Sequence, residues 1–578
     1  MGLARPAGFR GVWRDDAEAR AVYSEAAGIA RALPRAVAVP TDAADVQTLA
    51  AWASATGTPL VPRGAGSSMA GGAVGDGVLV DLSQLATLGA VDRPGRCVWA
   101  GPGVSGAAVD QAARAAGLRF PVDPSSWTWA TVGGMAATNA AGAHTLRHGA
   151  MRPWVAALDC VFADSTRAVV RRGEAPPDVP AVRRVLADVA PRVHAALGTG
   201  AVRARATRKE SSGYALAEWA RSGELVDLLV GSEGTLALFV GVELALAEPP
   251  GATASVLGTF ASLDDAVVGA ERARDAGAAA CELLDRTFLN VAAEGGALPE
   301  AARAGDGAVP EAVLLAEVEA DDAEGAAEQA RALGHAFRAA GAAHVVLAVD
   351  PAAEHAIWEL RHAASPILAK LDPRLKSMQF VEDGCVPPGR LPDYVRGVRA
   401  ALARHGVRGV IFGHAGDAHA HVNPLVDVSL PDWRARVEGL LDEVSALASS
   451  LGGTLAGEHG DGRLRTPLLA RTWAPEALAL FADVKRAFDP AGVLNPGVKV
   501  VLPGQRPLGD VKYDPALPPL PAAARRALDR VADGREYAAF RLALLDACVG
   551  AEGALAPPAD PLPPGEPLPD GALGHPGA

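Results

Sequence analysis

The chain has few cysteines, few lysines and no long apolar run, and each shortage argues against a class of protein. Its five cysteines are scattered and form no Cys-x-x-Cys pair, which argues against an iron–sulfur cluster or a disulfide framework. No apolar stretch reaches the ~18 residues of a transmembrane helix, so we expect no transmembrane segment. The formal net charge of -13 argues against a nucleic-acid partner. We therefore expect a cytoplasmic protein, with peripheral attachment to the inner face of the membrane as the alternative.

Glycine, in contrast, is abundant, with 64 of 578 residues, and its most informative cluster runs from Val61 to Ala73. This segment lies between two strand-like runs, Thr58–Val61 and Gly77–Leu82. Consecutive glycines let backbone N–H groups converge on one point, and serine hydroxyls add donors, which suits a diphosphate. Arg63 is the one permanent cation of this loop. A strand rather than a helix follows, so this is not the GxGxxG dinucleotide motif, and a flexible surface turn is the alternative.

Two further segments repeat the combination of a strand-like run with small and hydroxyl residues. The first runs from Pro121 to Gly142 and includes Thr131 and Asn139 as hydrogen-bonding side chains. The second is Leu229–Leu236. Because residues this small let the backbone lie flat against a ligand, three such segments favour a bound cofactor over a surface turn.

Three histidines fall within eight residues of the segment Gly413–Pro424. Alternation along an extended chain places His419 and His421 on the same side. A second cluster supplies Glu458 and His459. Two histidines with one glutamate are a common catalytic metal set, whereas buried neutral imidazoles without a ligand need other partners. The residues alone leave both a metal centre and a group of structural histidines open.

Taken in order, the three glycine-rich segments resemble the FAD-binding domain of the vanillyl-alcohol oxidase and p-cresol methylhydroxylase superfamily. They are most similar to its FAD-linked D-2-hydroxyacid dehydrogenases: D-lactate dehydrogenase, the flavin subunit of glycolate oxidase and D-2-hydroxyglutarate dehydrogenase. The resemblance runs from about Pro34 to about Lys499. It implies an α+β fold, with a two-subdomain FAD-binding domain of the p-cresol methylhydroxylase type and a ferredoxin-like α+β cap domain with an antiparallel sheet.

The Pro-rich segment Glu248–Gly251 is the clearest domain boundary. The expected parts are a helical lead-in (1–33), the FAD-binding domain (34–247), the substrate or cap domain (248–456), a segment returning to the flavin (457–502), and a helical, Pro-rich, partly disordered tail (503–578). In the FAD-binding domain we expect a helix over 104–116. In the cap we expect strands over 255–260, 312–318 and 344–349, with helices over 264–276 and 322–339 on one face.

The resemblance implies non-covalent FAD, because Ser67 stands where relatives with a histidyl-linked flavin carry histidine. His144 and His148 are the alternative attachment points. The residues implied to bind FAD are Pro62, Arg63, Gly64, Ala65, Gly66, Ser67, Ser68, Pro121, Asp123, Thr131, Gly133, Gly134, Ala137, Asn139, Gly142, Glu233, Gly234 and Asn495.

The resemblance also assigns the histidine clusters. His414, His421 and Glu458 match ligands of a divalent metal, most simply Zn²⁺, and His459 matches the proposed catalytic base. The chain departs from the family motif at His419, which stands where asparagine is usual and could compete as a ligand.

The substrate carboxylate needs a cation, and Arg361 resembles the family arginine that binds it bidentately. The alternative for Arg361 is a solvated charge on a helix surface. Lys376 matches a second cation that contacts substrate, and Ser365 and Asn423 match polar positions of the substrate site.

The resulting prediction is an FAD-dependent dehydrogenase of D-2-hydroxy acids. Because the chain lacks a cysteine cluster, electrons would pass to an external acceptor: a quinone, an electron-transfer flavoprotein or an iron–sulfur partner. The alternatives are a flavin subunit of a larger redox complex and an alkyl-dihydroxyacetone-phosphate-synthase-like flavoenzyme. That last branch usually has consecutive histidines, whereas here they alternate.

Overall fold

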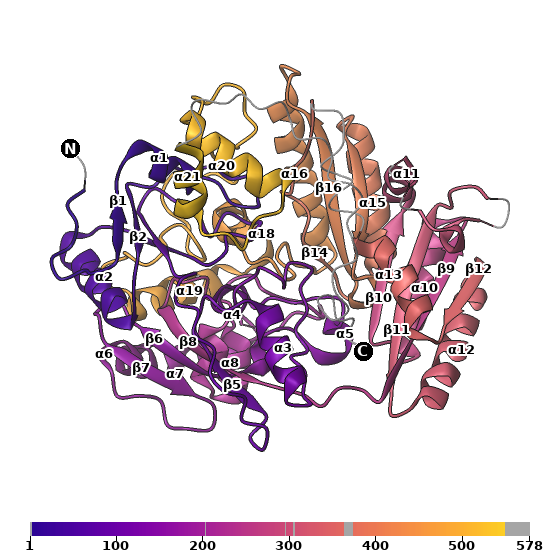
Figure 1. Ribbon diagram of the computed structural model, residues 1–578, viewed down its shortest axis with the longest axis horizontal. Helices are drawn as coiled ribbons and strands as arrows, with labels where there is room; N and C mark the ends of the chain where they lie inside the picture. The colour runs from indigo at the N-terminus through magenta and orange to yellow at the C-terminus, as the bar shows by residue number, and fades with distance from the viewer. Residues whose placement is uncertain are drawn as a thin grey trace.

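The computed structural model describes residues 3–202, 204–294, 296, 298–304, 307–362 and 374–549. Three sheets organise these residues, and Figure 1 shows the N-terminal part at the left and the largest sheet at the right. None of the helices in the described ranges combines the length and the apolar character needed to cross a lipid bilayer. The predicted disorder after Gly550 and the predicted substrate residue Ser365 lie outside the described residues.

The first sheet has the strand order β1-β2-β4-β3 and carries the glycine-rich loop. Strands β2 (Ala36–Val39), β3 (Leu60–Arg63) and β4 (Val78–Asp81) run parallel. Helix α2 (Ala43–Thr56) connects the first two, with Asp42 accepting the N–H of Asp45 as its N-cap. The loop therefore leaves the carboxyl end of β3 and enters a strand, as the sequence predicts.

The prediction of a purely helical lead-in was incomplete. Helix α1 (Ala17–Val22) is present, but β1 (Val12–Arg14) precedes it and pairs antiparallel with β2. Trp13 packs edge-on against Trp52, with ring centroids 5.8 Å apart. This long-range aromatic contact stabilises a strand that local sequence does not indicate.

The second sheet is antiparallel and has the order β5-β8-β6-β7. Its strands are β5 (Cys97–Ala100), β6 (Val155–Val161), β7 (Arg167–Arg171) and β8 (Leu238–Ala245). The helix expected over 104–116 is α3 (Gly106–Ala115), and it begins later because Ser105 is its N-cap. Helix α19 (Pro475–Phe488) closes the same core from much later in the chain, where Phe488 stacks on Phe162.

The third sheet is antiparallel throughout, in the order β12-β9-β11-β10-β15-β16-β13, with β14 paired to β16. Its strands are β9 (Ala252–Phe260), β10 (Ala280–Asp285), β11 (Ala312–Ala320), β12 (Ala342–Ala348), β13 (Leu375–Ser377), β14 (Gly384–Cys385), β15 (Arg408–Gly413) and β16 (His419–Asp427). The antiparallel cap sheet is as predicted, but β10, which supplies Glu282 to the site, was not predicted.

Helices cover both faces of this sheet, so the prediction of helices on one face was incomplete. Val256 belongs to the apolar core that includes residues of α10, α12, α15 and α16, whereas its neighbour Leu257 belongs to a second core with residues of α11 and α13. Successive strand residues point to opposite faces, and both are apolar here. The helices concerned are α10 (Leu263–Asp275), α11 (Arg286–Glu294), α12 (Ala323–Ala339), α13 (Pro351–His362), α15 (Leu391–Arg404) and α16 (Trp433–Ser450).

After α19 the chain crosses back to the first sheet and forms a helical hairpin. Its helices, α20 (Ala522–Asp533) and α21 (Arg541–Val549), pack on each other and on α1, as Figure 1 shows in yellow beside indigo. A shared apolar core with β2 and β4 anchors the hairpin. Other α-helices in the described ranges are α4 (Val132–Thr138), α5 (Thr145–His148), α6 (Pro180–Arg184), α7 (Ala190–Thr199), α8 (Leu216–Ser222), α9 (Leu225–Leu229), α17 (Gly462–Arg465) and α18 (Leu469–Thr472).

Candidate active site

A cavity of about 1030 Å³ is lined by segments of all three sheets. The glycine-rich loop after β3, the start of β8, and residues of β13, β15 and β16 all contribute to its wall. Its size is at the upper end of the ~300–1,000 Å³ range of ligand pockets, so it can hold a ligand larger than a small acid. Motifs that are far apart in the sequence therefore share one cavity.

Many of the predicted cofactor residues line this cavity. The loop and the start of α4 are in close contact, because a Cβ at Gly64 would lie 2.2 Å from Thr131 Oγ1. Thr131 is also the N-cap of α4 and accepts the N–H of Gly134. The lining residues from the predicted set are Pro62, Arg63, Gly64, Ala65, Gly66, Ser67, Ser68, Thr131, Gly133, Gly134, Ala137, Glu233 and Gly234.

Five other predicted cofactor residues do not line this cavity. Asn495 donates to the carbonyls of Gly72 and Glu233, which joins two loops of the cavity wall. Asn139 is the C-cap of α4 and has a left-handed backbone conformation. The Asp123 carboxylate accepts a hydrogen bond from His144 Nδ1. The complete group is Pro121, Asp123, Asn139, Gly142 and Asn495.

Glu233 lines the cavity but uses its carboxylate within the protein. It accepts the backbone N–H groups of Asp461 and Gly462 at 2.7 and 3.0 Å, and Lys499 Nζ lies 2.9 Å away. Lys499, which the sequence analysis did not single out, also bonds Asp461 at 2.9 Å. These buried contacts tie the Gly457–Gly462 segment to the predicted cofactor segment Leu229–Leu236.

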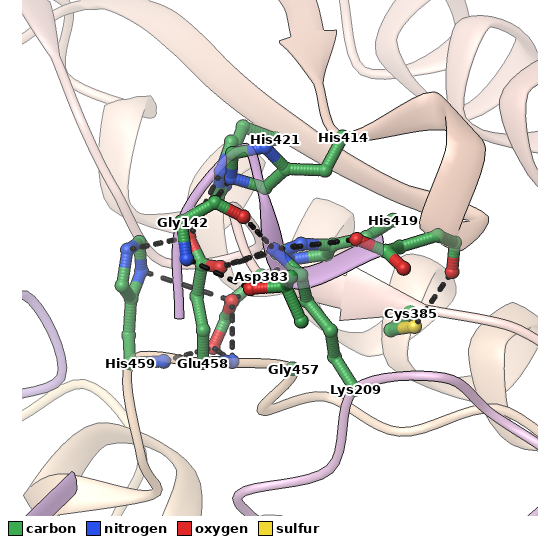
Figure 2. A network of polar contacts seen from close by, with 12 residues as sticks. Gly142, Lys209, Asp383, Cys385, His414, His419, His421, Gly457, Glu458 and His459 are labelled. Carbon is green, nitrogen blue, oxygen red and sulfur yellow. Dashed lines mark hydrogen bonds and ion pairs between the residues drawn. The ribbon is translucent and has the colours of Figure 1, made fainter. Parts of the chain in front are cut away.

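His414, His421 and Glu458 converge on one point, as Figure 2 shows. The Nε2 atoms of both histidines lie 3.3 Å from the same oxygen, Glu458 Oε1. All three residues are buried. β15 ends directly before His414, and His421 lies on its partner strand β16, so their antiparallel pairing brings the two rings together.

The outer nitrogens of these rings have fixed partners, which orients the inner ones. His421 Nδ1 donates to the carbonyl of Glu382 at 2.9 Å, so its Nε2 carries a lone pair. Burial lowers the pKa of His421, which keeps the ring neutral. A neutral Nε2 then faces a carboxylate oxygen with no proton between them, and a cation would satisfy both. These donors fit a divalent metal with two nitrogen ligands and one oxygen ligand.

The third histidine of the segment, His419, is fully buried and points to the same carboxylate. Its Nε2 donates to Asp383 at 3.0 Å, and its Nδ1 lies 3.8 Å from Glu458 Oε2. Burial lowers the pKa of His419 to about 3, so the ring is neutral. Nδ1 has no hydrogen-bond partner among the described residues. His419 is thus close enough to be a fourth ligand, the competition that its departure from the family motif suggests.

Lys209 holds the other oxygen of Glu458 and was missed by the sequence analysis. Its Nζ lies 2.6 Å from Glu458 Oε2 and also donates to the carbonyl of Gly142 at 3.1 Å (Figure 2). Burial opposes ionisation of Glu458, but Lys209 and His414 outweigh it and hold the pKa of Glu458 well below its usual value. Lys209 therefore directs Oε1 of the carboxylate toward the two histidines.

The adjacent acids Glu382 and Asp383 organise the segment that carries Glu458 and His459. Asp383 accepts the N–H groups of both Glu458 and His459, and Arg465 bonds both acids. Because these contacts involve residues about 80 positions apart, no local pattern predicts them. They fix the backbone beneath the predicted base.

His459, the predicted catalytic base, lines the cavity, and its ring is partly exposed. Its Nδ1 lies 3.3 Å from Glu382 Oε1, and its ring stacks on His421 with centroids 5.4 Å apart. Burial disfavours the charged ring, but Asp383 and Glu382 outweigh it and raise the pKa of His459. The surroundings therefore stabilise a proton on this ring.

Arg361, on α13, reaches the cavity and is not a solvated helix charge. Its Nε donates to Glu282 at 2.6 Å, and its guanidinium lies over the ring of Phe412. Lys376 on β13 and Asn423 on β16 line the same cavity. The structure thus brings together every predicted substrate residue that it describes.

The chain matches two protein families in consecutive parts: the FAD binding domain over residues 34–171, and the C-terminal domain of FAD linked oxidases over residues 249–498. D-lactate dehydrogenase from Archaeoglobus fulgidus is 31% identical over 470 residues, which cover 80% of this chain and 91% of that protein. Glycolate oxidase subunit GlcD from Bacillus subtilis is 28% identical over 494 residues, covering 84% and 93% respectively.

Solved structures confirm the predicted fold class. The 4-ethylphenol oxidase from Gulosibacter chungangensis has a TM-score of 0.63 at 16% identity, over 85% of this chain and 94% of that chain. p-Cresol methylhydroxylase has a TM-score of 0.60 at 12% identity, with the same coverage. Identities this low concern the fold alone, whereas the similarity to D-lactate dehydrogenase extends through both matched domains. The chain therefore belongs to the FAD-linked oxidases, as an FAD-linked oxidoreductase of the D-lactate dehydrogenase and glycolate oxidase type.

Proposed function

We propose that this enzyme oxidises a D-2-hydroxy acid to the 2-oxo acid, with FAD as the hydride acceptor. The observation that carries the proposal is the shared cavity. Arg361, Lys376 and His459 line the same space as the glycine-rich loop and two of the predicted metal ligands. A cation for the carboxylate, a base for the hydroxyl and a cofactor site are the three things this oxidation requires.

In this proposal Arg361 and Lys376 bind the substrate carboxylate. Glu282 accepts a hydrogen bond from Arg361 Nε at 2.6 Å, which fixes the plane of the guanidinium. The terminal nitrogens of Arg361 can then pair with the substrate carboxylate. Asn423 offers an amide hydrogen bond from the same wall, and Ser365 remains a prediction. Holding the acid at one end restricts C2 to one position in the cavity.

His459 removes the hydroxyl proton in this proposal. Its Nδ1 bonds Glu382, which leaves Nε2 to accept the proton. The neighbouring acids then stabilise the charged ring, consistent with its raised pKa. The chemistry that bound FAD supplies is acceptance of the C2 hydride at N5, and that of a bound divalent metal is polarisation of the hydroxyl oxygen.

A divalent metal would be held by His414 Nε2, His421 Nε2 and Glu458 Oε1. The neutral ring of His421 facing a carboxylate supports this assignment, and the mixed nitrogen and oxygen donors suit Zn²⁺. The flavin would be bound without a covalent link. In support, His144 and His148 both bond carboxylates and neither lines the cavity.

The proposed division of labour follows the predicted domains. Residues 34–247 hold the cofactor, 248–456 supply the substrate cations and two metal ligands, and 457–502 return Glu458 and His459 to the flavin. Electrons would leave through an external quinone, electron-transfer flavoprotein or iron–sulfur partner. All five cysteines are free, and four of them are buried.

Two alternatives have less support. The Bacillus subtilis relative is named as a subunit of glycolate oxidase, which keeps a flavin subunit of a larger redox complex as an alternative. Alkyldihydroxyacetonephosphate synthase shares the fold, with a TM-score of 0.56 at 14% identity, a likeness that concerns the fold alone.

The test is a panel of D-lactate, glycolate, D-2-hydroxyglutarate and D-malate with an artificial acceptor dye. We expect one acid to reduce the flavin and the dye, and its L-enantiomer, where it has one, to fail. Flavin that none of these acids reduces would contradict the proposal. Copurification with an iron–sulfur partner that is needed for turnover would instead favour the redox-complex alternative.

A further inference from the structure

The hairpin of α20 and α21 lies beyond residue 498, where the match to the C-terminal FAD-oxidase domain ends. It nevertheless forms part of the cofactor cavity. Arg525, Asp529, Arg535, Tyr537 and Arg541 from this hairpin line the same space as the glycine-rich loop. The hairpin is therefore a wall of the cavity that the family match does not cover.

Arg541 connects the hairpin to the loop directly. Its Nη2 donates to the carbonyl of Ala65 at 3.2 Å, in the middle of the glycine-rich segment. Its Nη1 donates to the carbonyl of Ala539 at 2.8 Å, so the guanidinium is held from both sides. The residue is only 3% exposed, and its Nε has no partner among the described residues.

A second guanidinium, that of Arg63, lies close by with similar partners. Its Nη1 donates to the carbonyl of Glu25 at 2.9 Å, and it lies over the ring of Tyr23. Burial lowers the pKa of Arg63 to about 10, and the positive charge of Arg541 contributes. Two buried cations thus border the loop.

Neither Arg63 nor Arg541 forms an ion pair with any carboxylate in the described part of the chain. Asp81 favours the charge on both guanidinium groups, but its Oδ2 accepts the Tyr23 hydroxyl at 2.5 Å, and Glu536 favours the charge on Arg541. Two buried cations with no directly paired carboxylate among the described residues favour an additional anion, because buried charge is costly unless it is paired.

We propose that Arg541 and Arg63 together bind the diphosphate of FAD, so that the C-terminal hairpin is a cofactor-binding element of this chain. The loop offers backbone N–H groups and serine hydroxyls, and the two guanidinium groups add fixed charge beside it. Trp129 and Tyr537 stack with centroids 5.8 Å apart, which closes the hairpin against the cofactor domain. The proposal rests on membership of an FAD-linked family and does not depend on which acid is oxidised.

The test measures flavin binding and not turnover. Full-length Arg541→Gln, freed of flavin, is titrated with FAD and with riboflavin, which has no phosphate, and flavin fluorescence gives each Kd. We expect the Kd of FAD to rise about 10- to 100-fold, which is the usual effect of losing a hydrogen bond to a charged group. The Kd of riboflavin should stay unchanged. Arg541→Lys should lose less FAD affinity, because the charge remains.

Arg526→Gln is the matched control. Arg526 donates to the carbonyl of Cys548 at 2.9 Å and ties the two helices together, but it does not line the cavity. Its variant should leave both Kd values unchanged. Equal weakening of FAD and riboflavin in Arg541→Gln would mean that Arg541 only shapes the loop, and an unchanged FAD Kd would also overturn the proposal. If Arg541→Gln fails to fold, the same comparison in Arg541→Lys decides between these outcomes.

Discussion

The carboxylate of Glu282 accepts a hydrogen bond from His414 Nδ1 at 2.6 Å, in the middle of the third sheet. Its other oxygen accepts Arg361 Nε, also at 2.6 Å. One buried carboxylate therefore joins a predicted metal ligand to the predicted substrate cation. Burial opposes the charge on Glu282, but His414 and Arg361 outweigh it and hold its pKa far below the usual range.

Glu282→Gln should weaken metal binding and substrate binding together. The amide keeps the shape but not the charge that orients both partners. Outer partners of metal ligands are typically worth about 10- to 100-fold in affinity, and we expect a loss of this size for the metal together with a raised KM. Competition with a chelating dye measures the first, and steady-state kinetics with metal in excess the second. A change in only one of the two would contradict the shared role of this carboxylate.

Chelation of the metal should abolish turnover and leave the flavin bound, because the two groups use different residues. Elemental analysis should find about one divalent ion per chain. Fully active enzyme that contains no metal would refute the assignment.

His414→Ala should lose more metal than His419→Ala. His414 directs Nε2 to Glu458 Oε1 at 3.3 Å, whereas His419 Nδ1 is 3.8 Å from Oε2 of the same carboxylate, which Lys209 already occupies. Metal content per chain after dialysis, measured for both variants, tests this order. Equal losses would make His419 a ligand.

His459→Ala should slow flavin reduction by about 100-fold or more, as expected for loss of a general base. Arg361→Ala should instead weaken substrate binding strongly, because it removes the carboxylate anchor. Stopped-flow reduction at a series of substrate concentrations separates the two effects. If the flavin of the His459 variant were reduced at the wild-type rate, another group would have to remove the hydroxyl proton.

The glycine-rich loop, the histidine segment and the antiparallel cap are predictable from sequence because each depends on local pattern. Glu282 and Lys209 are not, because each is brought to the site by a partner more than 100 positions away. Glu282 lies on β10 (Ala280–Asp285), whose strand pairing is entirely non-local. Arg541 is missed for a different reason: composition alone marks the C-terminal region as Pro- and Ala-rich, while its helices are held by a core shared with the first sheet.

The last prediction concerns His144, which links Asp123 of the predicted cofactor segment Pro121–Gly142 to Glu317 on β11 of the third sheet. Its Nδ1 bonds Asp123 at 2.5 Å and its Nε2 bonds Glu317 at 2.9 Å, so both ring nitrogens donate. Nearby, Arg119 Nη1 pairs with Glu319 at 2.8 Å, and His148 Nε2 lies 3.0 Å from the same carboxylate. Burial opposes the charged ring, but Asp123 and Glu317 outweigh it and raise the pKa of His144 well above its usual value.

A pKa that is raised in the folded state gives stability that is complete below the unfolded pKa of about 6.5 and is lost as pH rises through the folded value. The difference in free energy of unfolding between wild type and His144→Gln should therefore be largest at pH ~6 and shrink in alkaline solution. Urea unfolding at a series of pH values measures it, with the exposed His194→Gln as the control. A difference that stays constant with pH would mean that folding does not change the pKa of His144, and would contradict the paired, charged ring.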